Sequence, residues 1–431
     1  MYIKQASTTV LIGTLLLFLA LAILTGCGQS GDKASPAPSA IVSSPDNGQH
    51  SPAPSSKASP PNETHTDDPI KTKINEMTLD EKIGQLFIVG LDGTTMDAEA
   101  AGMIKQYKVG GFILFKPNIE NADQTLSLLN ELKSQNDANP VPLWLSVDQE
   151  GGRVARLSPE FAKLPTAAAV GEMGSASYTY GIGQALGAQL SALGFNMNYA
   201  PVLDINSNPN NPVIGDRSFG TTPQAVKLHG MEMMKGINSQ GVAAVAKHFP
   251  GHGDTSVDSH YDLPVVNKTL AQLKPFELIP FEEAISQGAD AIMVAHLLML
   301  ELDKDFPSSI SKKVIGGLLR EELGYDGVVI TDDLTMGGIL DGYWIGEAVV
   351  AAVQAGSDLM LIGHDDNLQL EALNALRHAV ESGKISEDRL DQSLHRILTL
   401  KQKYNLKDEP IQTIDVDAIN KRVQNALEAR P

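Results

Sequence analysis

The segment Val242-Ala243-Ala244-Val245-Ala246-Lys247-His248-Phe249-Pro250-Gly251-His252-Gly253-Asp254 joins a short apolar run to a cluster of polar side chains. An unbroken run of small and branched apolar residues is typical of a buried parallel strand. Pro250 and Gly251 then interrupt any regular backbone. We therefore expect a strand at 242–246 and, from Lys247 onward, a loop that carries titratable groups at the strand's carboxyl end.

The same pattern occurs along the whole body of the chain. Further apolar runs bounded by Gly, Pro or polar residues lie at 85–89, 111–115, 143–147, 195–199, 291–294, 328–330 and 359–362. Between most of them lie segments with helical periodicity, such as 185–193. Eight strands that alternate with helices predict a single (β/α)8 barrel, with a doubly wound open sheet as the alternative.

Polar residues directly follow most of these runs, which favours the barrel over the open sheet. The residues concerned are Asp148, Asp204, Lys247, His296, Asp332 and His364. In a (β/α)8 barrel the carboxyl ends of all strands converge on one rim, where active sites are found. We expect these side chains to share such a rim.

The first residues predict export rather than folded structure. Residues 1–26 contain an apolar run at 10–24 that ends in Leu24-Thr25-Gly26-Cys27, which resembles a bacterial lipobox. Cys27 is the single cysteine, so no internal disulfide can form, and we expect it to carry a lipid. An uncleaved anchor is the alternative, although such a run is short for a span of roughly 20 residues. The predicted location is outside the cytoplasmic membrane, lipid-anchored and facing the cell wall or periplasm.

The rest of the chain divides by composition. Residues 27–69 are rich in Ser and Pro and poor in large apolar side chains, which predicts a disordered linker. Residues 70–406 are enough for one large catalytic domain, and 407–431 are expected to form a tail or a short helix. The formal net charge of -19 argues against nucleic acid as a partner.

Several chemistries lack the motifs that they need. The chain has no glycine-rich dinucleotide or phosphate loop and no Gly-x-Ser-x-Gly. His248, His252, Asp258 and His260 could in principle bind a metal, but the charge of Lys247 would oppose a dication. We therefore predict neither a metal nor a cofactor.

Paired polar groups instead suit glycoside chemistry, which needs a carboxylate and a proton donor. Asp332 and Asp333 end an apolar run, and neighbours on a strand point to opposite sides, so one can face a substrate while the other is braced behind. Asp258 and His260 are two residues apart, so in an extended loop the carboxylate can hold the imidazole. The alternatives are that Asp332 caps a helix and that His260 is a surface histidine in a turn.

At this point four sequence blocks carry a resemblance to a known family. They are the run 247–260, Asp148-Gln149-Glu150-Gly151-Gly152, Gly215-Asp216-Arg217-Ser218-Phe219-Gly220 and Thr331-Asp332-Asp333-Leu334 followed by Met336. In this order they resemble glycoside hydrolase family 3, of the β-N-acetylglucosaminidase type. The resemblance runs from about residue 70 to about 404 and implies a (β/α)8 barrel with a retaining, exo-acting hydrolase activity.

The resemblance also implies roles for individual residues. Asp332 would be the nucleophile, His260 the acid/base and Asp258 the partner that orients His260. The substrate would be bound by Asp148, Arg217, Lys247 and His248. The expected substrate is a carbohydrate with terminal N-acetylglucosamine, either a muropeptide or a chitin-type oligosaccharide. The alternatives are a family 3 β-glucosidase or β-xylosidase, a phosphorylase with the same site, and a glycan-binding lipoprotein without activity.

Overall fold

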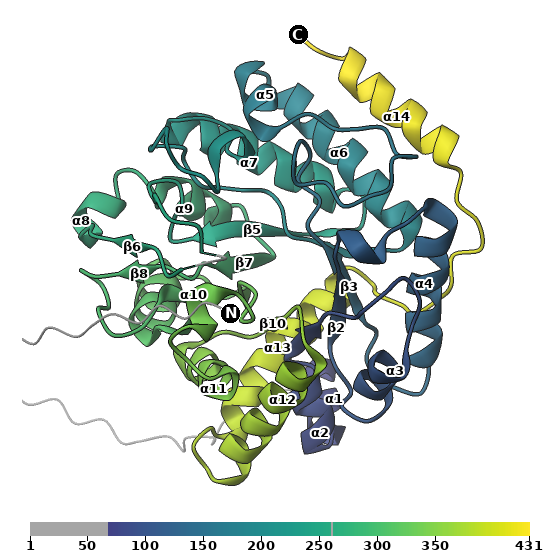
Figure 1. Cartoon of the computed structure of the whole chain (residues 1–431), viewed down its shortest axis with the longest axis vertical. Coiled ribbons are helices and arrows are strands. Elements are labelled where there is room, and N and C mark those ends of the chain that lie inside the picture. Colours follow the sequence, from purple (N-terminus) through teal and green to yellow (C-terminus); the bar gives the residue numbers. More distant parts are fainter. Residues whose placement is uncertain (1–67, 260–261) are drawn as a thin grey trace, which may run out of the picture. The chain divides into compact units, whose positions relative to one another are not determined.

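The eight apolar runs form eight parallel strands of one sheet, as predicted (Figure 1). The computed structural model describes residues 68–259 and 262–431, which lie in a unit that extends from His65 to Pro431. The strands are β1 Phe87–Val89, β2 Gly111–Leu114, β3 Trp144–Val147, β4 Met197–Asn198, β5 Ala243–Phe249, β7 Ala291–Val294, β9 Val328–Thr331 and β10 Met360–Ile362. Their order in the sheet is β10-β1-β2-β3-β4-β5-β7-β9.

The two ends of this order meet and turn the sheet into a barrel. A parallel bridge joins Ile330 of β9 to Leu359, and the N–H of Thr331 donates to the C=O of Leu359 at 3.0 Å. At the other side of β10, Met360 stands in register with Phe87 of β1. The (β/α)8 prediction is therefore confirmed, and the open-sheet alternative is wrong.

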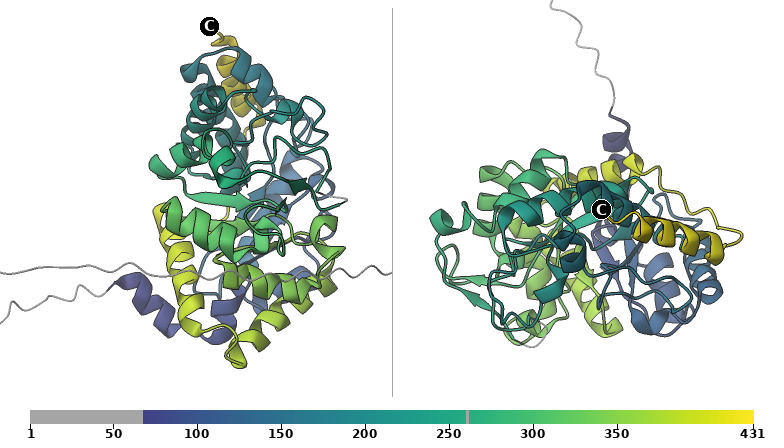
Figure 2. Two further views of the ribbon diagram at one scale, coloured as in Figure 1. Left: turned by 90° about the vertical axis from the view of Figure 1, so that its left-hand side faces the viewer. Right: turned by 90° about the horizontal axis from the view of Figure 1, so that it is seen from above.

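Helices surround the strands, as Figure 1 and the two views of Figure 2 show. The helices are α1 Pro69–Glu76, α2 Leu79–Gly84, α3 Ala98–Lys105, α4 Ala122–Gln135, α5 Ala167–Glu172, α6 Ala176–Leu193, α7 Pro223–Asn238, α8 Leu270–Leu273, α9 Ile279–Ser286, the π-helix η4 Lys313–Glu322, α10 Gly337–Leu340, α11 Ile345–Ala355, α12 Asp366–Glu381, α13 Glu387–Lys403 and α14 Val416–Glu428. Three short 3-10 turns complete the set, η1 Lys116–Asn118, η2 Gly215–Arg217 and η3 Ser308–Ile310. Because helices cover the outer face, the strands are buried on both sides and read as continuous apolar runs.

Local sequence explains where the helices begin and end. The side chains of Ser175, Thr222 and Ser386 each accept a backbone N–H of the first turn of α6, α7 and α13. Gly194 ends α6 with a φ of 100°, a conformation that a residue with a Cβ rarely adopts. These signals fix the helix ends so that each chain segment returns to the amino end of the next strand.

Strand β5 is longer than predicted, and this changes the place of two site residues. We expected Lys247 and His248 on a loop, but both lie on β5 itself. The N–H of Lys247 donates to the C=O of Pro201 at 3.1 Å, and the C=O of Phe249 accepts the N–H of Ala295 at 2.9 Å. Pairing with both neighbours therefore continues the strand to Phe249, although the apolar run ends earlier.

Outside the barrel strands, the structure adds a small sheet and a C-terminal helix, the latter within the stretch 407–431 that was expected to form a tail or a short helix. A second, two-stranded parallel sheet joins β6 Val265–Val266 to β8 Leu298–Met299. Helix α14 packs on α6 and buries Ile419 and Val423. Among the described residues, no helix has the length and apolarity needed to span a bilayer. The signal of residues 1–26, the linker of 27–69 except for its last two residues, and Cys27 lie outside the described residues.

Candidate active site

The carboxyl ends of β3 and β5 bring a lysine between two carboxylates. Lys247 on β5 donates from Nζ to Oδ1 of Asp148 at 2.6 Å and to Oε1 of Glu150 at 2.8 Å. Its side chain is buried, whereas that of Asp148 is 20% exposed. Burial by itself would lower the pKa of Lys247, but the charges of Asp148 and Glu150 reverse this effect and raise it. Lys247 therefore stays charged, and Asp148 presents the open side of the pair to the rim.

Arg217, at the end of η2, completes this ion-pair cluster from a third loop. Its Nε and Nη2 donate to the two carboxylate oxygens of Glu150 at 2.8 and 2.7 Å, which is a bidentate pair. Burial would raise the pKa of Glu150, but the charges of Arg217 and Lys247 outweigh it and hold that pKa far below its usual range. Glu150 thus acts as a fixed anion that orients both cations.

His248, next to Lys247 on β5, is held by a carboxylate from the loop after β4. Its Nδ1 lies 2.6 Å from Oδ2 of Asp204, and its Nε2 lies 3.4 Å from Nη2 of Arg217. An ionised carboxylate can only accept and a guanidinium can only donate, so these partners assign the proton to Nδ1. Asp204 also accepts the backbone N–H of His252 at 2.6 Å. It therefore connects the strand residue with the loop that follows.

The two carboxylates after β9 lie in different surroundings, as expected from strand geometry. Asp332 is half-buried at the rim, and its Oδ1 accepts the N–H of Asp333 at 2.9 Å. Asp333 is buried, and its Oδ1 accepts from the N–H of Gly363 and from both the N–H and the hydroxyl of Thr335. Asp333 is thus the braced residue, and Asp332 is the one that can face a ligand.

Electrostatics separates these two carboxyls further. Burial would raise the pKa of Asp332, but the neighbouring His296 and His248, the N–H of Asp333 and the charge of Lys247 together lower it. Burial prevails at Asp333 and raises its pKa despite the hydrogen bonds to Gly363 and Thr335. Asp332 is accordingly an ionised carboxylate at neutral pH, as a nucleophile must be.

The loop after β5 carries the other predicted residues. His252 is buried, and its Nδ1 and Nε2 lie 2.8 and 3.2 Å from the hydroxyls of Thr255 and Ser259. Burial and the neighbouring His248 lower the pKa of His252 to about 4, so it is a neutral structural residue. Asp258 is half-buried near the end of this loop, and its C=O accepts the N–H of Asp262 at 3.1 Å. His260 lies outside the described residues, so its acid/base role stays a prediction.

Most of the chain is similar to known proteins. A family model described as the glycosyl hydrolase family 3 N terminal domain matches residues 78–400. The chain belongs to glycosyl hydrolase family 3. Its curated relatives include β-hexosaminidase A of Pseudoalteromonas piscicida, 38% identical over 72% of this chain and 56% of that protein. The β-hexosaminidase of Thiobacillus denitrificans is 38% identical over 62% of this chain and 75% of that protein.

Solved structures agree with this membership in family 3. A glycoside hydrolase family 3 β-N-acetylglucosaminidase from Paenibacillus sp. str. FPU-7 has a TM-score of 0.79 and 44% identity, over 82% of this chain and 69% of that chain. The family 3 chain thus spans little more than half of the Pseudoalteromonas protein and about two thirds of the Paenibacillus structure.

Two anions of the family 3 site have roles that the sequence did not predict. Glu150 and Asp204 are the anions that hold the predicted residues Arg217 and His248. Glu150 stood within a quoted motif and Asp204 followed a strand, but only the packing of neighbouring loops shows what they bind.

The described residues offer no group of three or more His, Cys, Asp or Glu side chains placed to hold a metal ion. His248 and His252 have ring centroids 5.9 Å apart, but each is engaged elsewhere, His248 by Asp204 and His252 by two hydroxyls. The arrangement of these histidines is therefore that of hydrogen-bonded side chains.

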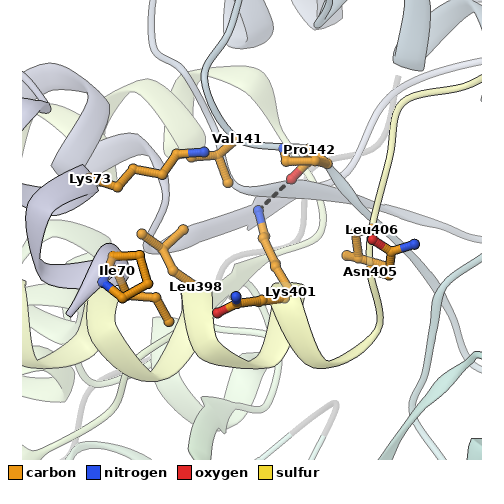
Figure 3. A pocket seen from close by; sticks show the side chains of 10 residues that line it. Ile70, Lys73, Val141, Pro142, Leu398, Lys401, Asn405 and Leu406 are labelled. Atoms are coloured by element: carbon orange, nitrogen blue, oxygen red, sulfur yellow. Dashed lines mark hydrogen bonds between the residues drawn. The ribbon is translucent and has the colours of Figure 1, made fainter. Parts of the chain in front are cut away.

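The opposite end of the family 3 barrel contains a cavity of about 310 Å³ between α1, α13 and the segment before β3 (Figure 3). Lys401 reaches into the barrel floor there and donates to Oε1 of Gln85 and to the C=O of Gly110 and of Pro142. Burial lowers the pKa of Lys401 to about 7. These three acceptors match the three N–H groups of an ammonium. Lys401 therefore has a structural role, in which it joins α13 to the segments before β1, β2 and β3 at the amino end of the barrel.

Proposed function

We propose that this chain is a retaining, exo-acting β-N-acetylglucosaminidase that removes terminal β-linked N-acetylglucosamine. The observation that carries the proposal is Asp332, an ionised and half-buried carboxylate at the same barrel end as the Asp148–Lys247 pair and His248. The names of the relatives support the choice of sugar, since they are β-hexosaminidases and a β-N-acetylglucosaminidase. Asp148 can accept two sugar hydroxyls, while Lys247, Arg217 and His248 hold the polar wall around them.

The proposed reaction has two displacements at the anomeric carbon. In the first, a carboxylate oxygen of Asp332 bonds to the anomeric carbon as the glycosidic C–O bond breaks, and the leaving oxygen takes a proton from His260. In the second, water gives its proton to His260 and its oxygen attacks the same carbon, which releases Asp332. Asp258 would hold the imidazolium of His260 in both steps. Two inversions give net retention.

The first test compares substrates on the purified protein, with and without EDTA. We expect turnover of an aryl N-acetyl-β-glucosaminide, little turnover of the matching glucoside and no effect of the chelator. A preference for the glucoside would favour a family 3 β-glucosidase, and sugar phosphate formed on addition of phosphate would favour a phosphorylase. Glycan binding by folded protein without any turnover would identify a binding lipoprotein instead.

Asp332→Asn tests the nucleophile. The amide cannot form the glycosyl-enzyme, so we expect kcat to fall about 1000-fold or more while the thermal unfolding midpoint stays close to that of the wild type. Steady-state kinetics and circular dichroism check both parts. Retention of most of the activity would refute the assignment of Asp332.

His260→Ala tests the acid/base by its dependence on the leaving group. Activated aryl glycosides need little proton donation, so their cleavage should suffer far less than that of unactivated disaccharides. We measure kcat/KM for a series of aryl leaving groups with rising pKa. Equal losses across the series would count against an acid role.

The natural substrate and the location form the finer part of the proposal. An exported enzyme anchored through lipid on Cys27 would meet cell-wall fragments, so we propose N-acetylglucosaminyl-β-1,4-N-acetylmuramic acid, with or without peptide, as the substrate. Cys27→Ala should move the protein from the membrane fraction to the soluble fraction of cells. Cleavage of chitin oligomers but not of muropeptides would assign the enzyme to chitin-type substrates.

A further inference from the structure

Trp344 is a large aromatic side chain held in an exposed position. It is 76% exposed, whereas Trp144, the other tryptophan of the chain, is completely buried. Its two neighbours are fixed, because the hydroxyl of Tyr343 donates to the C=O of Asp305 at 2.9 Å and Ile345 is buried. The indole therefore projects from the N-cap position of α11, between two residues that are each held by contacts with the rest of the domain.

An open groove of about 620 Å³ begins at this tryptophan. It lies between α11 and α12, which pack side by side on the outside of the barrel (Figure 1). Its lining combines the apolar residues Trp344, Gly346, Val350, Ala375 and Ala379 with polar ones that include Glu347, Glu371, Asn374, His378 and Lys384. A mainly apolar lining with a few hydrogen-bonding groups is typical of a ligand site.

The chemistry of the groove selects the kind of ligand. A pyranose ring has an apolar C–H face that can lie on an indole, and hydroxyl or acetamido groups that bond to carboxylates, amides and imidazoles. The groove offers the two carboxylates of Glu347 and Glu371 against the single ammonium of Lys384. This balance disfavours anionic glycans and suits uncharged ones.

The groove also begins at the barrel end that carries the active site. Helices of a (β/α)8 barrel start at the carboxyl ends of the strands, and α11 follows β9 and the Asp332 turn. Trp344, at the start of α11, thus lies on the rim side, while the groove leads away from it along the barrel wall. A polymer bound there would remain close to the catalytic end.

From these observations we propose that the α11–α12 groove is a second carbohydrate site, separate from the active site, for uncharged oligomers of β-linked N-acetylglucosamine. The choice of N-acetylglucosamine rests on the sugar specificity in the proposed function, and not on the anionic muropeptide proposed there as natural substrate; the existence of the site rests on Trp344 and the groove. The site would raise the local concentration of polymeric substrate and take no part in bond cleavage.

Tryptophan fluorescence tests the proposal directly, because Trp344 is the solvent-exposed member of the chain's two tryptophans. In the full chain carrying Asp332→Asn, we titrate N-acetylchitotetraose and follow emission and iodide quenching. Bound sugar should shift the emission to shorter wavelength and protect Trp344 from iodide. Excess N-acetylglucosamine monosaccharide, added to fill the active site, should leave this response in place.

The second arm uses variants and calorimetry. Trp344→Ala should weaken tetraose binding roughly tenfold or more, as loss of a central aromatic anchor does. Leu228→Ala removes another exposed apolar side chain, on α7, and should leave the affinity unchanged. Absence of iodide protection at millimolar tetraose, or equal affinities for the two variants, would overturn the proposal. Tetraose binding by a protein that hydrolyses no glycoside would refute the proposed function and leave this site standing.

Discussion

Asp332 and Asp333 show how one peptide unit gives two identical side chains different properties. The first is half-buried beside two histidines and Lys247, which lower its pKa, and the second accepts three hydrogen bonds in a buried position that raises its pKa. The difference follows from the alternation of side chains along a strand. Substitution of Asp332 should therefore mainly lower kcat, whereas substitution of Asp333 should mainly lower the free energy of unfolding.

We expect Asp333→Ala to lower the free energy of unfolding by about 1–3 kcal/mol, because Gly363 and Thr335 lose their acceptor. Asp333→Asn keeps an acceptor oxygen and should cost less. The native carboxyl, whose pKa is raised, binds a proton that the unfolded chain releases, so its contribution to stability falls as pH rises through the native pKa. Urea unfolding at several acidic pH values should show this loss for the wild type and not for Asp333→Asn.

Asp204→Asn tests the support of His248. The amide has one acceptor oxygen where the carboxylate has two. If that oxygen keeps the N–H of His252, the NH2 group faces Nδ1 of His248, and the imidazole must turn or place its proton on Nε2, towards Arg217. We expect kcat/KM for an aryl N-acetyl-β-glucosaminide to fall about 10- to 100-fold, the range for loss of a charged hydrogen bond. An unchanged kcat/KM in a folded variant would show that this contact does not matter for catalysis.

At the scale of elements, the sequence predicted the existence and order of the strands, but not the residue at which a strand such as β5 ends. Buried parallel strands are continuous apolar runs, so all eight were visible, and their carboxyl ends placed Asp148 and Asp332 on one rim. The extension of β5 through Lys247 depends on backbone hydrogen bonds to Pro201 and Ala295. The apolar pattern could not predict this extension, because the side chains of Lys247 and His248 are polar. The partnership of Glu150 with Arg217 likewise depends on where two distant loops meet.

The loop after β5 depends on a close approach that tolerates no side chain. A Cβ on Gly253 would lie 1.7 Å from the backbone oxygen of Ile205, so the two loops must separate if any other residue stands there. Because the same loop carries Asp258, Gly253→Ala should reduce kcat/KM at least tenfold and also lower the unfolding midpoint. Gly102→Ala, in helix α3 with open space around it, is the control and should be neutral or slightly stabilising. Comparable activity of the two variants would contradict this interpretation.

At the scale of the whole molecule, Lys401 links α13 to the floor of the barrel. Burial lowers its pKa to about 7 from an ordinary 10.5, so between these values the unfolded chain holds a proton that the native chain has released. Stability should therefore rise with pH through this window. Lys401→Met has no such titrating group. The difference in the free energy of unfolding between the wild type and this variant should therefore be larger at about pH 9 than at about pH 7. Urea unfolding of both proteins at the two pH values measures it, and a constant deficit would refute the linkage.

The Lys247–Glu150–Arg217 cluster has a consequence for the surroundings in which the protein can work. These side chains are only 2%, 6% and 11% exposed, and each cation has its anion within the chain. Dissolved salt weakens attractions between exposed charges beyond about 8 Å at physiological ionic strength, but it reaches buried pairs much less. We therefore expect the affinity of the site for an uncharged sugar to vary little with the ionic strength of the medium.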